Sequence, residues 1–401
     1  MMALLAGLVV EFLWGMNSEL NFFRILFGKV LYLFISVQFL WAQFYGDPPD
    51  KTHPWAVHDN NRPQPPRIEP GEILGTPPSD AIILFDGTKE SFKANWKHEK
   101  HKRKKDWKVI NGALISVDGA GDLLSKAIFA DCQLHIEWAA PSKIIGSGQG
   151  RGNSGIFLMG ITEVQVLDNY KNPTYPDGFA GSVYGIMPPM VNALKPLGQW
   201  QTYDIIFRRP VHRDGKALDE GYLTVFLNGV VVQDGTPLEG GGVHKDRSRS
   251  RLFPVKGPLK LQDHGNPVKF RNIWYRELRQ RSVEGGTDGE LSYEATTTKR
   301  AEIAASIRKD ATTKKGKEKL LRLMESLYYE EDAVAITDAE KLRSEFINQV
   351  KINPDDYKGD IIQVNNAIKY LIKHQRMQSD HPDIQILEKI IKNNGWNAQD
   401  N

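Results

Sequence analysis

Cysteine is almost absent from this sequence, since Cys132 is the only one among 401 residues. A single cysteine excludes an intrachain disulfide, so the folded state must depend on its apolar core. An excess of charge of one sign is also missing: 52 Lys and Arg residues face 49 Asp and Glu residues, a formal charge of +3. This balance argues against nucleic acid as a partner. Cys132 alternates with polar residues in an apolar run, which favours a buried structural thiol over a nucleophile.

The first 42 residues are unlike the rest because they contain two apolar blocks, residues 2–15 and 30–42. Arg24 and Lys29 precede the second block, and the small residue Ala42 ends it. This pattern predicts a signal peptide over residues 1–42, with export to the periplasm or the cell exterior. Without a cysteine at the cleavage point the product is not a lipoprotein, and no membrane attachment is expected after cleavage. A membrane anchor is the alternative, because both blocks together reach the length of a span.

Changes in composition divide the remaining chain into four parts. Residues 43–78 are dense in Pro and polar residues and predict an extended linker or arm. Residues 79–281 contain short β-rich runs separated by turn residues, which predict a sandwich of antiparallel sheets. Two Asn-Gly pairs, at 111–112 and 228–229, are typical hairpin turns. A Gly-rich linker is expected over 282–298, followed by a domain of helices over 299–401.

Helical periodicity supports the prediction for this last part. Apolar residues recur at helical spacing in 317–330 and 337–350, and again in 381–395. Thr337 and Glu340 have the spacing of a capping box, which predicts a helix start at Thr337. No cluster of chemically active residues occurs there, so its role stays open.

Two other motifs give only weak support for a ligand site. The GRGNSG stretch at 150–155 has the spacing of a dinucleotide-binding loop, but it precedes a predicted strand with no helix after it, so no nucleotide is expected. The basic run at 97–107 lies between two predicted strands and favours a solvated loop, with an acidic glycan contact as the alternative.

Polar residues on two predicted strands are more informative. Alternation puts Glu163 and Gln165 on one face of their strand and Val164 and Val166 on the other. This arrangement, with Asp168 just beyond it, favours the floor of a site for a polyhydroxylated ligand over an ordinary exposed face.

The stretch 261–278 carries an unusual number of polar residues for a strand. It brings His264, which can move a proton near neutral pH, next to Asp263 and Gln262, with Arg271 following. Alternation predicts that Asp263 lies with Leu259 and Leu261, unless Gly265 forms a bulge. Trp200 could stack on a sugar ring or pack in the core.

These stretches resemble the 3-keto-disaccharide hydrolase domain family, which includes 3-keto-glycoside hydrolases and lyases. The resemblance rests on six ordered blocks, residues 83–88, 152–170, 175–185, 198–207, 226–235 and 257–278. It implies a concanavalin A-like jelly-roll with a ligand groove on one sheet. Two departures are Gln199, where many members have Glu before the Trp, and the helical carboxyl-terminal domain, which is not part of the family pattern.

The resemblance also implies the chemistry. Once a partner sugar 3-oxidoreductase has oxidised C3 of a glycoside to a ketone, a base can remove the C2 proton and the C1 aglycone is eliminated. Hydration then gives net hydrolysis. The proton-moving candidates are Glu163, His264, Asp168 and Asp263. The substrate-binding candidates are Arg151, Asn153, Gln165, Tyr184, Trp200, Gln262 and Arg271. A divalent metal held by Glu163, Asp168 and His264 is an open alternative.

Two other functions remain as alternatives. A non-catalytic carbohydrate-binding domain could use the same fold and the same polar face. A conventional glycosidase would need two carboxylates at a fixed spacing across the scissile bond, and no such cluster is evident in the sequence.

Overall fold

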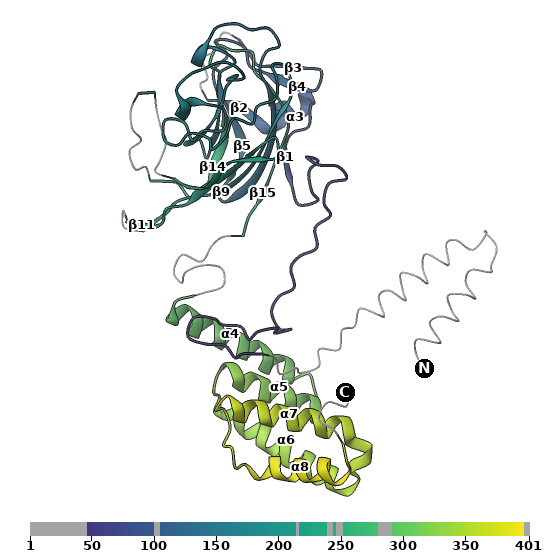
Figure 1. Cartoon of the computed structure of the whole chain (residues 1–401). Coiled ribbons are helices and arrows are strands. Elements are labelled where there is room, and N and C mark those ends of the chain that lie inside the picture. The colour runs from purple at the N-terminus through teal and green to yellow at the C-terminus, as the bar shows by residue number, and fades with distance from the viewer. Residues whose placement is uncertain are drawn as a thin grey trace, which may run out of the picture. The chain divides into compact units, whose positions relative to one another are not determined.

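The computed structural model describes residues 46–99, 105–213, 216–238, 244–245, 252–279 and 291–396. The predicted signal peptide at 1–42 and residues 100–104 of the basic run lie outside this part. The chain divides into two compact units. Residues 65–279 form the β unit, and residues 46–64 together with 291–396 form the helical unit (Figure 1).

The larger sheet of the β unit has eight antiparallel strands. Across the sheet their order is β13 (Val230–Pro237), β12 (Tyr222–Leu227), β9 (Gln201–Arg208), β6 (Cys132–Ala139), β15 (Lys269–Glu277), β4 (Ala113–Ile115) and β3 (Lys108–Ile110). The eighth strand, β1 (Ile82–Phe85), also pairs with β15. Neighbouring strands here come from distant parts of the chain, as in a jelly-roll.

The smaller sheet has five antiparallel strands. Their order is β2 (Trp96–His98), β5 (Leu123–Phe129), β14 (Gly257–Leu261), β7 (Ser154–Leu158) and β8 (Thr162–Val166). The short helix α3 (Lys89–Asn95) connects β1 to β2, and β10 (Val211–Arg213) pairs with β11 (Lys216–Asp219) as a separate ribbon.

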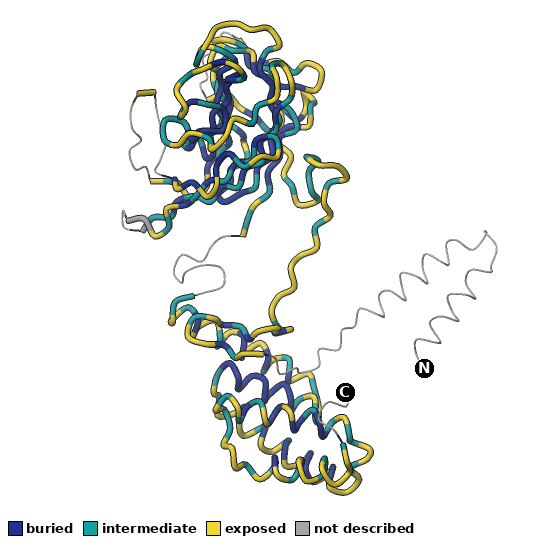
Figure 2. The backbone as a smooth tube through the Cα atoms, in the orientation of Figure 1, coloured by how far each residue is buried: buried dark blue, intermediate teal, exposed yellow. Residues whose placement is uncertain are grey.

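One apolar core lies between the two sheets, because each strand turns alternate side chains inward. β6 contributes Leu134 and Ile136, β14 contributes Leu259, and β8 contributes Val164, all fully buried. Burying one such side chain contributes about 1.5–3 kcal/mol. Figure 2 shows buried residues running through the middle of the β unit. Each sheet therefore has an outward face, and the two outward faces lie on opposite sides of the sandwich.

Local features of the β unit follow the sequence. Asn111 and Gly112 have φ of 51° and 73°, and Asn228 and Gly229 have φ of 55° and 81°. Both pairs connect adjacent strands, so the two predicted hairpins are confirmed. Cys132 is a buried free thiol, as predicted, and burial raises its pKa.

The described part of the Pro-rich segment is divided between the two units, and each portion contacts the unit to which it belongs. Within the helical unit Trp55 packs edge-on against Tyr329, with ring centroids 6.5 Å apart. Within the β unit the carbonyl of Gly75 accepts hydrogen bonds from Asn272 Nδ2 at 2.8 Å and Trp274 Nε1 at 3.0 Å. Residues on either side of Gln64 are thus each bound to folded structure.

The helical unit has five α-helices in its described part. They are α4 (Tyr293–Ala311), α5 (Gly316–Tyr329), α6 (Ala333–Ile352), α7 (Lys358–Lys373) and α8 (Pro382–Asn393). Their inner faces bury residues such as Met324 and Ile368 in a core of their own. Asp332 caps α6, since its carboxylate accepts from Ala335 N at 2.8 Å. The predicted start at Thr337 is wrong, because this stronger cap begins the helix earlier. No helix in the described ranges has both the length and the apolar character to cross a membrane.

Candidate functional site on the five-stranded sheet

Two rows of residues cross the outward face of the five-stranded sheet. In the first row Lys260 pairs with Phe157, and Phe157 pairs with Glu163. The backbone of Tyr184 extends this row, since its N–H donates to Glu163 O at 3.2 Å.

The second row runs beside the first. Gln262 N donates to Gly155 O at 3.0 Å, Gly155 pairs with Gln165, and Gln165 N donates to Ser182 O at 3.1 Å. We call the seven side chains of both rows the Glu163 face: Phe157, Glu163, Gln165, Ser182, Tyr184, Lys260 and Gln262. It brings together four of the residues expected from the sequence, Glu163, Gln165, Tyr184 and Gln262.

Glu163 is buried on this face without a protein partner. Its exposed fraction is 7%, and no hydrogen bond or ion pair engages its carboxyl group among the described residues. Gly155 makes the room for it: a Cβ at that position would lie 2.3 Å from Glu163 Oε1. Burial raises the pKa of Glu163 to about 8, with Lys260 lowering it and Asp122 raising it further. A carboxyl group with this pKa can exchange a proton near neutral pH.

Lys260 was not singled out from the sequence, although its alternation with Leu259 and Leu261 assigns it to the polar face. Its Nζ lies 4.2 Å from the centroid of the Phe157 ring. Its two carboxylate neighbours are Asp122 Oδ2 at 3.5 Å and Glu99 Oε1 at 3.9 Å.

Tyr184 places a phenol group at the end of the first row away from Lys260. Tyr184 OH lies 2.8 Å from Tyr175 OH and 3.4 Å from His244 Nδ1. Burial, together with the bond to Tyr175, raises the pKa of Tyr184 above that of a free phenol. Tyr184 therefore stays protonated and can donate a hydrogen bond.

Several buried polar atoms of this face have no protein partner. Gln165 Nε2 donates to Gln149 Oε1 at 3.0 Å, but Gln165 Oε1 is unpaired, as are Ser182 Oγ and Gln262 Oε1. Unpaired buried polar atoms cost free energy unless a ligand or water satisfies them. Hydroxyl groups of a bound sugar would supply the missing partners.

The remaining expected residues occupy other places. Arg151 Nε donates to Asp168 Oδ2 at 2.6 Å, and this buried ion pair joins the loops at the ends of β7 and β8. Asn153 Nδ2 donates to Gln149 O at 2.8 Å. These three side chains thus hold the loops beside the Glu163 face, and Asp168 is already engaged by Arg151.

Asp263 and His264 lie in a turn after β14. The strand ends at Leu261, so alternation is no guide beyond it, and the side on which Asp263 lies stays a prediction. Asp263 accepts hydrogen bonds from Gly121 N at 2.9 Å and Ser116 Oγ at 3.2 Å. His264 is exposed, and no hydrogen bond within the described ranges involves its ring.

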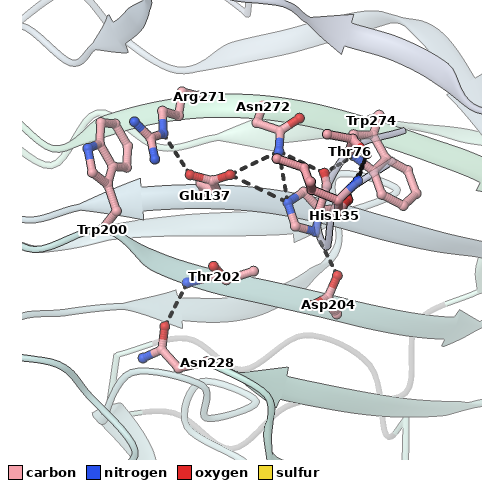
Figure 3. Close-up of polar contacts among 12 residues, drawn as sticks. Thr76, His135, Glu137, Trp200, Thr202, Asp204, Asn228, Arg271, Asn272 and Trp274 are labelled. Atoms are coloured by element: carbon pink, nitrogen blue, oxygen red, sulfur yellow. Dashed lines mark hydrogen bonds and ion pairs between the residues drawn. The ribbon is translucent and has the colours of Figure 1, made fainter. Parts of the chain in front are cut away.

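Arg271 and Trp200 lie on the outward face of the other sheet (Figure 3). Arg271 Nε donates to Glu137 Oε2 at 2.6 Å, and the guanidinium carbon lies 4.1 Å from the Trp200 ring centroid. The expected single set of residues is therefore divided between opposite sides of the sandwich. The sequence predicted a single set of residues because residue spacing does not show which sheet a strand joins.

An open cavity of about 550 Å³ also lies on that second face, beneath residues 68–78. Its wall includes Asp204 and Arg276, but Asp204 accepts from His135 and Arg276 is bonded to Asp80. Glu72 also lines the cavity without a hydrogen bond or ion pair among the described residues, but its side chain is exposed, unlike that of Glu163. The unpaired atoms of the Glu163 face make it the stronger candidate.

Metal ligands are not gathered in the described part of the chain. No group of three or more His, Cys, Asp and Glu side chains there could hold an ion. Glu163, Asp168 and His264 in particular are not brought together, so these residues do not fit the metal alternative.

The β unit is similar to known proteins. Residues 80–276 match the model of the 3-keto-alpha-glucoside-1,2-lyase-like domain. No curated protein matches the chain. A solved structure of a candidate glycosyl hydrolase from Parabacteroides distasonis is 41% identical over 55% of this chain and 95% of its own, with a TM-score of 0.51.

A second structure from Parabacteroides distasonis, described in the same words, is 19% identical over 50% of this chain and 94% of its own, with a TM-score of 0.36. The first relative carries the assignment, because its identity is high and nearly its whole length is covered. Through its β unit, the chain belongs to the family of 3-keto-alpha-glucoside-1,2-lyase-like domains, which is glycosyl hydrolase-like.

Proposed function

We propose that the Glu163 face cleaves 3-keto-glycosides by elimination followed by hydration. The observation that carries this proposal is the buried, unpartnered carboxyl of Glu163, whose pKa is raised to about 8. The C2 proton beside a C3 ketone is acidic enough for such a base. An unoxidised sugar offers no comparable proton, so the base suits the oxidised substrate.

The steps can be assigned to groups of this face. The Glu163 carboxylate takes the proton from C2, and the electron pair moves into an enolate with its charge on the C3 oxygen. Collapse of the enolate breaks the bond from C1 to the aglycone oxygen. Tyr184, kept protonated by burial and by its bond to Tyr175, is positioned to hydrogen-bond that leaving oxygen. Addition of water across the new double bond completes net hydrolysis.

Glu163 suits the role of base better than the other proton-moving candidates. Asp168 is held by Arg151, and Asp263 accepts two hydrogen bonds from the loop between β4 and β5. His264 is exposed to water, which would compete with substrate for its ring. Gln165 and Gln262 would hold sugar hydroxyls through their unpaired oxygens.

The test is release of a chromogenic aglycone from a 3-keto-β-glucoside, run beside the unoxidised parent glucoside. We expect turnover of the keto substrate alone, and a loss of about 10²–10⁴-fold in Glu163→Gln. Turnover of the parent would instead indicate a conventional glycosidase. Binding without turnover of either compound would indicate a carbohydrate-binding module.

This chemistry also requires an enzyme that oxidises the C3 hydroxyl, because the ketone is the substrate. We propose that a sugar 3-oxidoreductase acts before this protein. Supplying such an enzyme and its electron acceptor with the unoxidised glucoside should restore aglycone release, and failure to do so would argue against the coupling.

Export of the protein is a separate proposal, based on the pattern of residues 1–42. Mass spectrometry of the mature protein from a secreting host should find an amino terminus at Gln43. An intact amino terminus retained in the membrane fraction would support the anchor alternative.

A further inference from the structure

Lys260 brings a positive charge to the Glu163 face without committing its ammonium group to a short ion pair. Its side chain is 16% exposed, and the nearest carboxylate oxygens, on Asp122 and Glu99, are 3.5 and 3.9 Å away. A saturated ammonium group makes bonds of about 2.7–2.9 Å. Because an ammonium group carries three N–H donors, at least one proton remains for a ligand beside these two longer contacts.

Lys260 and Glu163 flank the same phenyl ring. β14 and β8 lie on either side of β7, so their backbones are about 10 Å apart. Lys260 Nζ leans over the Phe157 ring, while Glu163 Oε1 and Phe157 Cε2 meet above the bare Cα of Gly155. No ion pair joins Lys260 to Glu163 among the described residues.

Keeping these two groups apart has a chemical consequence. A direct pair would engage the ammonium group and lower the pKa of the Glu163 carboxyl, which would make it a weaker base. The ammonium is held instead by Asp122, just before β5, and Glu99, just after β2, while Tyr184 and Asp122 are titratable neighbours of Glu163. A buried carboxyl group without a protein partner, such as that of Glu163, costs stability and is typical of functional sites.

We propose that Lys260 binds the C3 oxygen of the oxidised sugar and stabilises the enolate formed when Glu163 removes the C2 proton. This inference rests on the proposed function. Arg271, a cationic substrate-binding candidate from the sequence, pairs with Glu137 on the opposite face of the sandwich and is not available for this role.

The step balances without a co-reactant. The bond from C2 to hydrogen breaks and the proton goes to Glu163, while its electron pair forms the double bond between C2 and C3. The carbonyl electrons become a negative charge on the C3 oxygen, opposite the ammonium. Lys260 keeps its protons throughout, and the carbonyl is restored when the aglycone leaves.

The experiment compares Lys260→Met and Lys260→Arg with the full-length protein on the chromogenic 3-keto-β-glucoside. Removing a group that stabilises developing charge costs about 10²–10³-fold in kcat. We expect that loss in Lys260→Met and a partial recovery in Lys260→Arg, which retains the charge. Lys256→Met is the matched control, since Lys256 pairs with Glu277 near the same strand and is predicted to leave kcat unchanged.

A substrate deuterated at C2 separates this role from a structural one. Losing enolate stabilisation makes C2 proton removal slower, so the primary isotope effect on kcat should increase in Lys260→Met. Lys260→Gln serves as the second variant should the Met variant not fold. If the wild type turns over the substrate and a folded Lys260 variant keeps the same kcat and isotope effect, this inference is wrong but the proposed function stands. Absence of wild-type turnover would overturn the proposed function as well.

Discussion

At the residue scale, burial of Glu163 links activity to pH. A general base must be ionised, and burial raises the pKa of Glu163 to about 8. We therefore predict that kcat/KM for the keto substrate increases with pH through about 8 and then levels. Initial rates between pH 5.5 and 10 check this. An increase centred near pH 4.5, the value of an ordinary Glu, would show that Glu163 is not the base.

The same burial must weaken the fold at high pH. The unfolded chain ionises Glu163 near pH 4.5, whereas the folded chain resists ionisation until about 8, so this group's contribution falls as pH rises between these values. Glu163→Gln removes this cost, which is at most about 5 kcal/mol. Urea unfolding of both proteins should show the variant gaining relative stability from pH 5 to pH 9. Parallel pH dependences would contradict the raised pKa.

Gly155 gives a third prediction at this scale. An added Cβ would meet Glu163 Oε1 at 2.3 Å and Phe157 Cε2 at 2.7 Å, so Gly155→Ala must displace one of these groups. We predict a large loss of kcat and destabilisation of about 1–3 kcal/mol, typical of overpacking. Gly150→Ala is the control, because a Cβ there meets nothing within 4 Å. Equal behaviour of the two variants would show that Glu163 is not confined by Gly155.

At the element scale, alternation predicted which face a side chain occupies but not which sheet its strand joins. It correctly separated Glu163 and Gln165, on the outward face, from Val164 and Val166, which pack in the core between the sheets. It gives no guide after Leu261, where the strand ends and Asp263 accepts from Gly265 N in a turn. Strand order depends on pairing between distant segments, and one sequence carries no direct signal for that.

The outward face of β6 supports a prediction about pH. His135 Nδ1 lies 2.7 Å from Asp204 Oδ1, and the ring stacks on Trp274 with centroids 5.1 Å apart (Figure 3). Burial disfavours its charge, but the hydrogen bonds to Asp204 and Glu137 prevail, so the pKa of His135 is raised. Its contribution to stability is therefore full below the unfolded value and is lost as pH rises through the folded pKa.

Asp204→Asn should consequently destabilise the protein more at pH 6 than at pH 9. We expect about 1 kcal/mol at pH 6, a modest figure because Asp204 is 38% exposed and screened by solvent. Asp80→Asn is the matched control: Asp80 pairs with Arg276, which stays charged at both values, so its effect should not change. Urea unfolding at both pH values measures the difference, and an equal effect of Asp204→Asn would contradict the raised pKa.

At the scale of the whole molecule, residues 46–64 of the arm complete the helical unit. Asn61 accepts from Arg322 Nη1 at 2.9 Å and donates to Glu325 Oε1 at 2.5 Å. Burial raises the pKa of Glu325 to about 7, against the effect of Arg322. The sequence predicted an extended segment here from its Pro content, but no local pattern could reveal a partner 264 positions away.

All residues of the Glu163 face belong to the β unit, which has its own core. A fragment of residues 65–279 should therefore retain kcat/KM within about twofold of the full chain, as expected of a domain that folds alone. Cooperative urea unfolding would verify that it folds, and Glu163→Gln in the fragment would verify that its turnover uses the same site. A folded fragment without turnover would place part of the active site in the helical unit. That unit would then have a catalytic role which none of its own side chains suggests.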